Sequence, residues 1–137
     1  MLLMRRLFRD RFGELDEAVM VLPVLLLISL GLVNLGMLGF AAINAGNAAN
    51  YGARMGAVAQ ADAPGVAVAN AYQMLSHAPV GSYTVSVSGS GIPGDRMSVQ
   101  VSYSVPNYFV GLAGFFGVST PAEFSNTATS YFRQEGW

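Results

Sequence analysis

The side chains that could perform acid–base, nucleophilic or metal chemistry are few in this sequence and far apart. The 137 residues include a single histidine, His77, and neither cysteine nor lysine. These absences exclude thiolate zinc sites, iron–sulfur ligation, cysteine nucleophiles and Schiff-base lysines. Beyond the N-terminal region the acidic residues stand at widely separated positions, namely Asp62, Asp95, Glu123 and Glu135. No carboxylate pair can be proposed from them, so we expect no catalysis, no metal and no cofactor.

Two patterns that resemble functional motifs have simpler interpretations. His77 stands two residues before Pro79 at the predicted end of a helix, where an imidazole commonly interacts with terminal carbonyls. We therefore interpret it as a helix-end residue rather than a base or ligand. Gly89, Gly91 and Gly94 match the dinucleotide pattern GxGxxG. They join two predicted antiparallel strands and no helix follows them, so the dinucleotide interpretation fails its structural condition.

The charged residues are concentrated at the N-terminus. Only 11% of the chain is charged, against about 25% in a typical soluble domain. Eight of the fifteen charged side chains lie in residues 1–17, MLLMRRLFRDRFGELDE, and none lies between Ala18 and Ala53. The net charge of −1 excludes a nucleic-acid partner bound through bulk positive charge.

Residues 18–43 predict a transmembrane helix. Such a helix is about 39 Å long, and the hydrocarbon core of a bilayer is about 30 Å thick. The alternatives are a buried core helix, which rarely runs so long without a charge, and a cleaved signal peptide, whose apolar region is shorter. Four arginines precede the run and only Arg54 follows it closely. The positive-inside rule therefore places the N-terminus in the cytoplasm and the rest outside.

The helix is predicted to continue beyond this span through residues 41–61, AAINAGNAANYGARMGAVAQA. One of its faces there carries only small side chains. Small residues at a spacing of four let another helix or sheet approach the backbone closely. The alternative is that alanine simply favours helix. We expect close packing, with other membrane subunits or pilin-like proteins as partners beside membrane lipid. The candidate helix-packing residues are Ala45, Ala49, Gly52, Ala53, Gly56 and Ala57.

The remainder predicts a small α+β domain. Asp62 and Pro64 are typical of a helix start, and an apolar stripe follows to about Ser76. The stripe consists of Val68, Ala71, Tyr72 and Leu75. Alternating apolar and Ser/Thr residues then predict two strands from Ser82 to Val105 and a third over 123–133. The fold class is therefore α+β, with a long N-terminal transmembrane helix, a second short helix and a three-stranded antiparallel sheet packed on it.

An apolar connection at residues 105–121, VPNYFVGLAGFFGVSTP, separates the last two predicted strands without clear periodicity. Seventeen residues are many for a plain loop. The segment closes the domain core, lies on the membrane surface, or presents a surface to a partner. The candidate partner-surface residues are Tyr108, Phe109, Phe115 and Phe116.

The order of these features resembles the TadE-like pilin-related proteins of the bacterial tight-adherence system. The likeness rests on Glu17 followed by Pro23 in VLPVLLL, on ANYGARMGA at residues 49–57, and on VSYSVPNYF at residues 101–109. The resemblance implies cleavage after a glycine, here Gly13, and a glutamate that helps helices assemble. Cleavage after Gly13 places Glu17 at mature position four, where the family has it at five. The sequence therefore leaves open whether residues 1–13 are removed.

The sequence and the resemblance together favour a non-catalytic single-pass protein of the bacterial cytoplasmic membrane. Its expected parts are a cytoplasmic N-terminal segment at 1–17, a transmembrane helix at 18–43 and an extracytoplasmic α+β domain at 44–137. The first hypothesis is a TadE-like minor pilin that acts structurally in pilus assembly or anchoring. The alternative is an uncleaved TadE-like accessory subunit that stabilises a larger membrane complex, such as a respiratory or photosynthetic electron-transfer complex.

Overall fold

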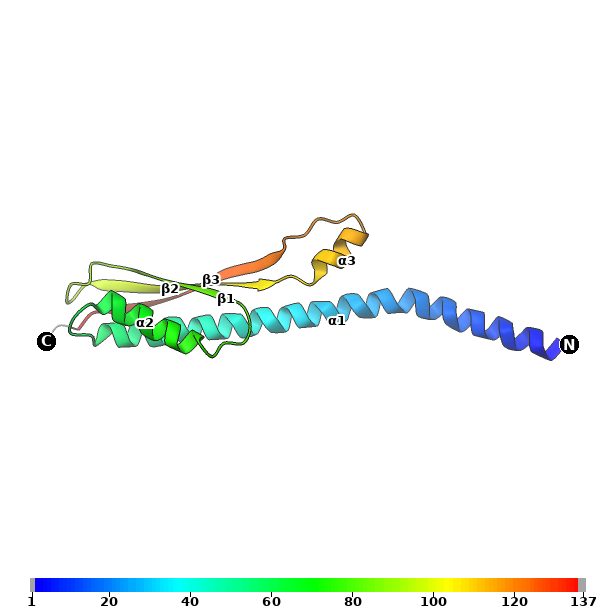
Figure 1. Ribbon diagram of the computed structural model, residues 1–137, viewed down its shortest axis with the longest axis horizontal. Coiled ribbons are helices and arrows are strands. Elements are labelled where there is room, and N and C mark those ends of the chain that lie inside the picture. Colours follow the sequence, from blue (N-terminus) through cyan, green and yellow to red (C-terminus); the bar gives the residue numbers. More distant parts are fainter. Residues whose placement is uncertain (1, 136–137) are drawn as a thin grey trace. The chain divides into compact units, whose positions relative to one another are not determined.

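The computed structural model describes the backbone of residues 2–135, and the side chains of residue 19 and residues 21–135 (Figure 1). The chain packs as two compact units, residues 1–33 and residues 34–137, which are described separately below. The elements in chain order are α1 (Leu2–Ala57), α2 (Ala63–Leu75), β1 (Ser82–Ser88), β2 (Arg96–Pro106), α3 (Phe109–Phe115) and β3 (Glu123–Arg133). The predicted α+β class is confirmed.

The first unit is the N-terminal part of α1. The helix begins at Leu2 and includes Pro23. It thus takes in residues 2–17, for which the sequence analysis predicted no secondary structure. The predicted continuation of the apolar helix is confirmed, but α1 ends at Ala57 and not at Ala61. There the chain turns, with the amide of Ala59 donating to the carbonyl of Gly56 at 3.2 Å.

Helix α2 begins as its sequence predicts. Asp62 is the N-cap, and its carboxylate accepts a hydrogen bond from the amide of Gly65 at 3.2 Å. Asp62 adopts a left-handed conformation with φ 48°, and Pro64 lies in the first turn. The predicted apolar stripe is only partly correct, because Tyr72 is 44% exposed. The buried residues recur every fourth position instead, at Ala63, Ala67, Ala71 and Leu75.

Within the described residues, three strands form one antiparallel sheet in the order β1-β2-β3, which confirms the prediction. The register pairs Val85 with Val101 and Val101 with Ala128. The central strand β2 alternates, so that one face of the sheet is apolar and the other carries serine and threonine. Its buried inner residues are Met97, Val99, Val101, Tyr103 and Val105.

The core of the second unit lies between this apolar face and two helices. The predicted packing of the strands on α2 accounts for only part of it, because α1 also enters the core through alanines (Figure 1). These fully or almost fully buried residues of α1 are Ala41, Ala45, Ala48, Ala49 and Ala53. The second unit therefore begins at Asn34, inside the predicted span. The predicted boundaries at 18, 43 and 44 stay predictions, because they concern a bilayer and not packing within the chain.

Candidate functional site

The exposed apolar surface of α1 bears on whether this helix crosses a membrane. Between Val21 and Ala57 the helix contains an 18-residue window with a mean hydropathy of 2.4, of which only 6% is buried inside the chain. A core helix of a soluble protein buries its apolar side chains against its own chain. In this helix large apolar side chains are exposed from Val19 to Ile43. By length and composition the helix can cross a membrane.

Asn34 interrupts this apolar run and makes contacts that the sequence analysis did not predict. Its side chain is 4% exposed, and its Nδ2 donates to Oδ1 of Asn107 at 3.1 Å. Its Oδ1 accepts from the backbone amide of Tyr108, also at 3.1 Å. Asn107, which is 6% exposed, in turn donates through Nδ2 to the carbonyl of Pro121 at 2.8 Å. This Asn34–Asn107 pair joins α1 to the connection between β2 and β3.

A signal for this pair exists in the sequence. A polar residue within a long apolar helix faces a partner more often than lipid, which singles out Asn34 but does not identify Asn107. Asn107 follows directly after β2, and its amide donates to the carbonyl of Ala122, the residue just before β3. The partner becomes apparent only once the strands are paired, because residues 34 and 107 are far apart in the sequence.

The small-residue face of α1 packs inside the chain. A Cβ added to Gly52 would lie 2.7 Å from the carbonyl oxygen of Ala67, and one added to Gly56 would lie 2.9 Å from both Ala67 Cβ and Phe132 Cζ. These glycines therefore let α2 and β3 approach α1 closely. The predicted close packing is present, but α2 and the sheet of the same chain supply it. The predicted helix-packing residues on this face are Ala45, Ala49, Gly52, Ala53 and Gly56, which are buried, and Ala57, which is partly buried.

The aromatic connection lies on the outside of the second unit. It contains a helix, α3, that the sequence analysis did not predict, and no residue of α3 is buried in the described part of the chain. Phe115 is 84% exposed, Tyr108 and Phe116 are also exposed, and Phe109 is partly buried. The prediction that this segment closes the core is therefore wrong. The membrane-surface and partner-surface interpretations remain.

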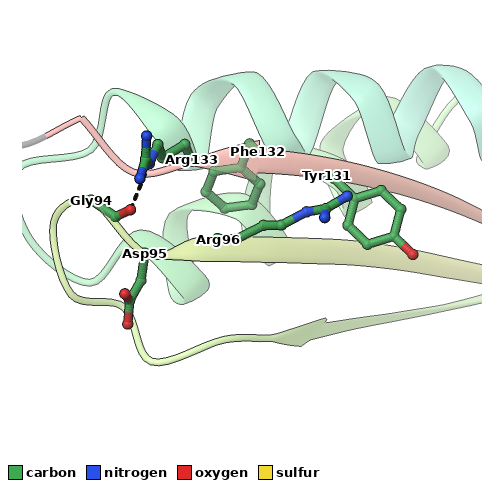
Figure 2. A pocket seen from close by; sticks show the side chains of 6 residues that line it. All are labelled: Gly94, Asp95, Arg96, Tyr131, Phe132 and Arg133. Atoms are coloured by element: carbon green, nitrogen blue, oxygen red, sulfur yellow. Dashed lines mark hydrogen bonds between the residues drawn. The ribbon is translucent and has the colours of Figure 1, made fainter.

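A shallow hollow of about 540 Å³ lies near the β1–β2 turn (Figure 2). The guanidinium of Arg96 lies 4.2 Å from the ring centroid of Tyr131, and Nε of Arg133 donates to the carbonyl of Gly94 at 2.7 Å. The carboxylate of Asp95 accepts from the hydroxyl of Ser90. Both arginines and the carboxylate thus hold the turn and the strand ends together, and we interpret the hollow as structural.

The remaining candidate residues are placed as follows. His77 is exposed just after α2, with Nδ1 3.0 Å from Oγ of Ser76, as expected for a helix-end residue. Among the described side chains no group of three His, Cys, Asp or Glu residues could hold a metal ion. Pro23 lies in α1 and is partly buried. Gly13 and Glu17 lie in α1, and the side chain of Glu17 is outside the described side chains.

Comparison with known families bears on the same helix. The family model described as TadE-like protein matches residues 17–54. This segment is TadE-like. The resemblance predicted from Glu17, Pro23 and the start of the ANYGARMGA stretch is thereby confirmed. The part of it carried by residues 101–109 lies outside the match and stays a prediction.

The TadE-like segment contains the exposed apolar helix surface, Asn34 and most of the small-residue face. It ends at Arg54, before α2 and the sheet. No curated protein and no solved structure matches the chain. The TadE-like match and the helix that is long and apolar enough to cross a membrane thus fall on the same part of the chain.

Proposed function

We propose that this protein is a non-catalytic single-pass membrane protein that acts structurally in the assembly or anchoring of a pilus. In this proposal α1 crosses the bacterial cytoplasmic membrane, residues 1–17 lie in the cytoplasm and the α+β unit lies outside. The observation that carries the proposal is that the TadE-like match and the uncharged, exposed helix surface fall on the same residues. A structural role is supported by the engagement of Arg96, Arg133 and Asp95 in holding strand ends.

The orientation can be tested with single cysteines, because the natural chain has none. Ser86→Cys lies on the exposed outer face of β1. Asp16→Cys lies before the span and stays in the chain whether or not cleavage follows Gly13. A membrane-impermeant maleimide should label Ser86→Cys in spheroplasts and Asp16→Cys only after lysis. Labelling in the reverse order would contradict the orientation, and recovery in the soluble fraction would contradict the anchor.

The role in a pilus can be tested by deletion and by mass spectrometry of the native protein. We expect deletion to remove surface filaments and the plasmid-borne wild type to restore them. A mature mass beginning at Glu14 would support processing as a pilin. Unchanged filaments, an intact N-terminus and co-purification with a multi-span complex would overturn the proposal in favour of an accessory subunit.

A further inference from the structure

We propose that the connection around α3 inserts into the outer surface of the membrane that α1 crosses, so that the protein contacts lipid through two separate segments. The α3 connection is defined as residues 107–122, between β2 and β3. In this proposal the α3 connection lies at the boundary between lipid headgroups and acyl chains. The inference rests on the proposed membrane anchorage.

The α3 connection is attached to α1 at the level of Asn34. The uncharged run begins at Ala18, and about 20 helical residues cross the hydrocarbon, so the span ends near residue 37. Asn34 therefore lies in the last turn of the span. Because Asn34 accepts from the amide of Tyr108 at 3.1 Å, the start of α3 is held at the same level. A segment attached there meets the outer leaflet and not bulk water.

The exposed surface of the α3 connection is uncharged and rich in apolar side chains. No charged residue occurs between Arg96 and Glu123, so the whole α3 connection is uncharged. Contiguous exposed apolar side chains of this kind mark protein or membrane contact sites. Tyrosine is enriched at the membrane interface, and phenylalanine is typical of the apolar face of segments that lie in it. The exposed large apolar side chains here are Tyr108, Val110, Phe115, Phe116 and Val118.

The exposed apolar surface of α1 also continues beyond Asn34 in the same unit. Leu35, Phe40 and Ile43 follow Asn34 along the helix, and all three are exposed. The polar atoms between the helix and α3 are suited to this depth, since the amide groups of Asn34 and Asn107 are buried and paired with each other and with backbone groups. Backbone and amide groups are tolerated at membrane depth only when they are satisfied within the protein.

The test places an environment-sensitive nitrobenzoxadiazole label on single cysteines of the full-length protein. The labelled protein is reconstituted into vesicles of phosphatidylethanolamine and phosphatidylglycerol, and quenching by spin-labelled lipid is compared with quenching by aqueous iodide. Phe115→Cys reports on α3. Ile92→Cys is the matched control, because Ile92 is 59% exposed in the β1–β2 turn at the opposite end of the sheet (Figure 1). Leu26→Cys reports on the span.

We expect the label at residue 115 to be quenched by spin-labelled lipid and to be several-fold less sensitive to iodide than the label at residue 92. If residue 26 is lipid-quenched but residue 115 behaves like residue 92, the inference is overturned and the anchorage stands. If residue 26 is itself open to iodide, the proposed anchorage fails. Protection of residue 115 from both quenchers would indicate a protein contact and contradict the inference.

A second variant tests the attachment at Asn34. In Asn34→Ser the shorter side chain cannot bridge to Asn107 and Tyr108, so α3 is no longer fixed to the helix. Lipid quenching at residue 115 should fall while quenching at residue 26 is unchanged. Unaltered quenching at residue 115 would contradict the argument that Asn34 sets the depth of α3.

Discussion

At the scale of single residues, Asn107 holds the α3 connection together. Its Oδ1 accepts from Nδ2 of Asn34 and from the amide of Phe109, the latter at 2.9 Å. Asn107→Leu leaves both donors without this acceptor, the one on Asn34 buried and the one on Phe109 partly buried, and a buried unsatisfied group costs about 1–3 kcal/mol. We expect the free energy of unfolding in detergent micelles to fall by about 2 kcal/mol or more. The matched control is Asn47→Leu on the exposed side of α1, and an equal loss in both variants would contradict this role.

Gly52 offers a second test at this scale, because it lies where α1 and α2 approach most closely. Alanine is favoured over glycine within a helix by about 1 kcal/mol, but a Cβ at Gly52 would lie 2.7 Å from the carbonyl oxygen of Ala67. Gly52→Ala should therefore destabilise the second unit by about 1–3 kcal/mol, measured by denaturant unfolding. Gly46→Ala should be neutral or stabilising, because its added Cβ would meet no described atom within 4 Å beyond its own stretch of helix. Stabilisation by both substitutions would show that α2 does not pack as described.

Gly52 also shows how much of the packing the sequence could predict at this scale. The spacing of Gly52 and its neighbouring alanines predicts a face that another element can approach, and in this chain α2 lies against Gly52. The spacing could not identify the element, because a helix face of small side chains suits α2 of the same chain and a helix of another protein equally well. The choice depends on the turn after Ala57, which reverses the chain and brings α2 onto α1.

At the scale of elements, the start of α2 can be tested at Asp62. This residue combines a cap hydrogen bond with a left-handed backbone at φ 48°. Asp62→Ala loses the cap and places alanine in a conformation that L-residues disfavour, so the free energy of unfolding should fall by about 1–2 kcal/mol. Asp62→Gly should lose only a few tenths of a kcal/mol, because glycine adopts this conformation readily. A larger loss for glycine than for alanine would overturn this account.

The elements differ in how well their patterns predicted them. Period-two alternation correctly predicted β1, β2 and β3, because each has one face toward the core. Helix α3 escaped prediction because none of its described residues packs against the core, so no apolar periodicity is imposed on it. In α2 the predicted stripe included Tyr72, which is 44% exposed and whose hydroxyl accepts a hydrogen bond from the amide of Val85 in β1. The residues that approach α1 are Ala67 and Ala71 instead.

At the scale of the whole molecule, the apolar surface of α1 and the packed α+β unit should respond independently to mutation. Leu26 lies in the first unit and its side chain is exposed. Leu26→Arg should weaken membrane insertion by about 2.5–3.5 kcal/mol and raise the fraction extracted by alkaline carbonate. The stability of the second unit in detergent should be unchanged, because the substitution removes no contact of its core. Leu26→Ala is the control for loss of side-chain volume.

Leu26→Arg has a different effect in a membrane helix than in the core helix of a soluble protein. If α1 were the buried helix of a soluble protein, an arginine at Leu26 would lower the free energy of unfolding and leave extraction unchanged, because a buried unpaired charge is strongly destabilising. If α1 instead faces lipid, Leu26→Arg weakens membrane insertion and leaves the fold of the second unit unchanged. A different readout therefore changes under each interpretation: extraction for a membrane helix, and the free energy of unfolding for a core helix. One substitution in the uncharged run decides between them.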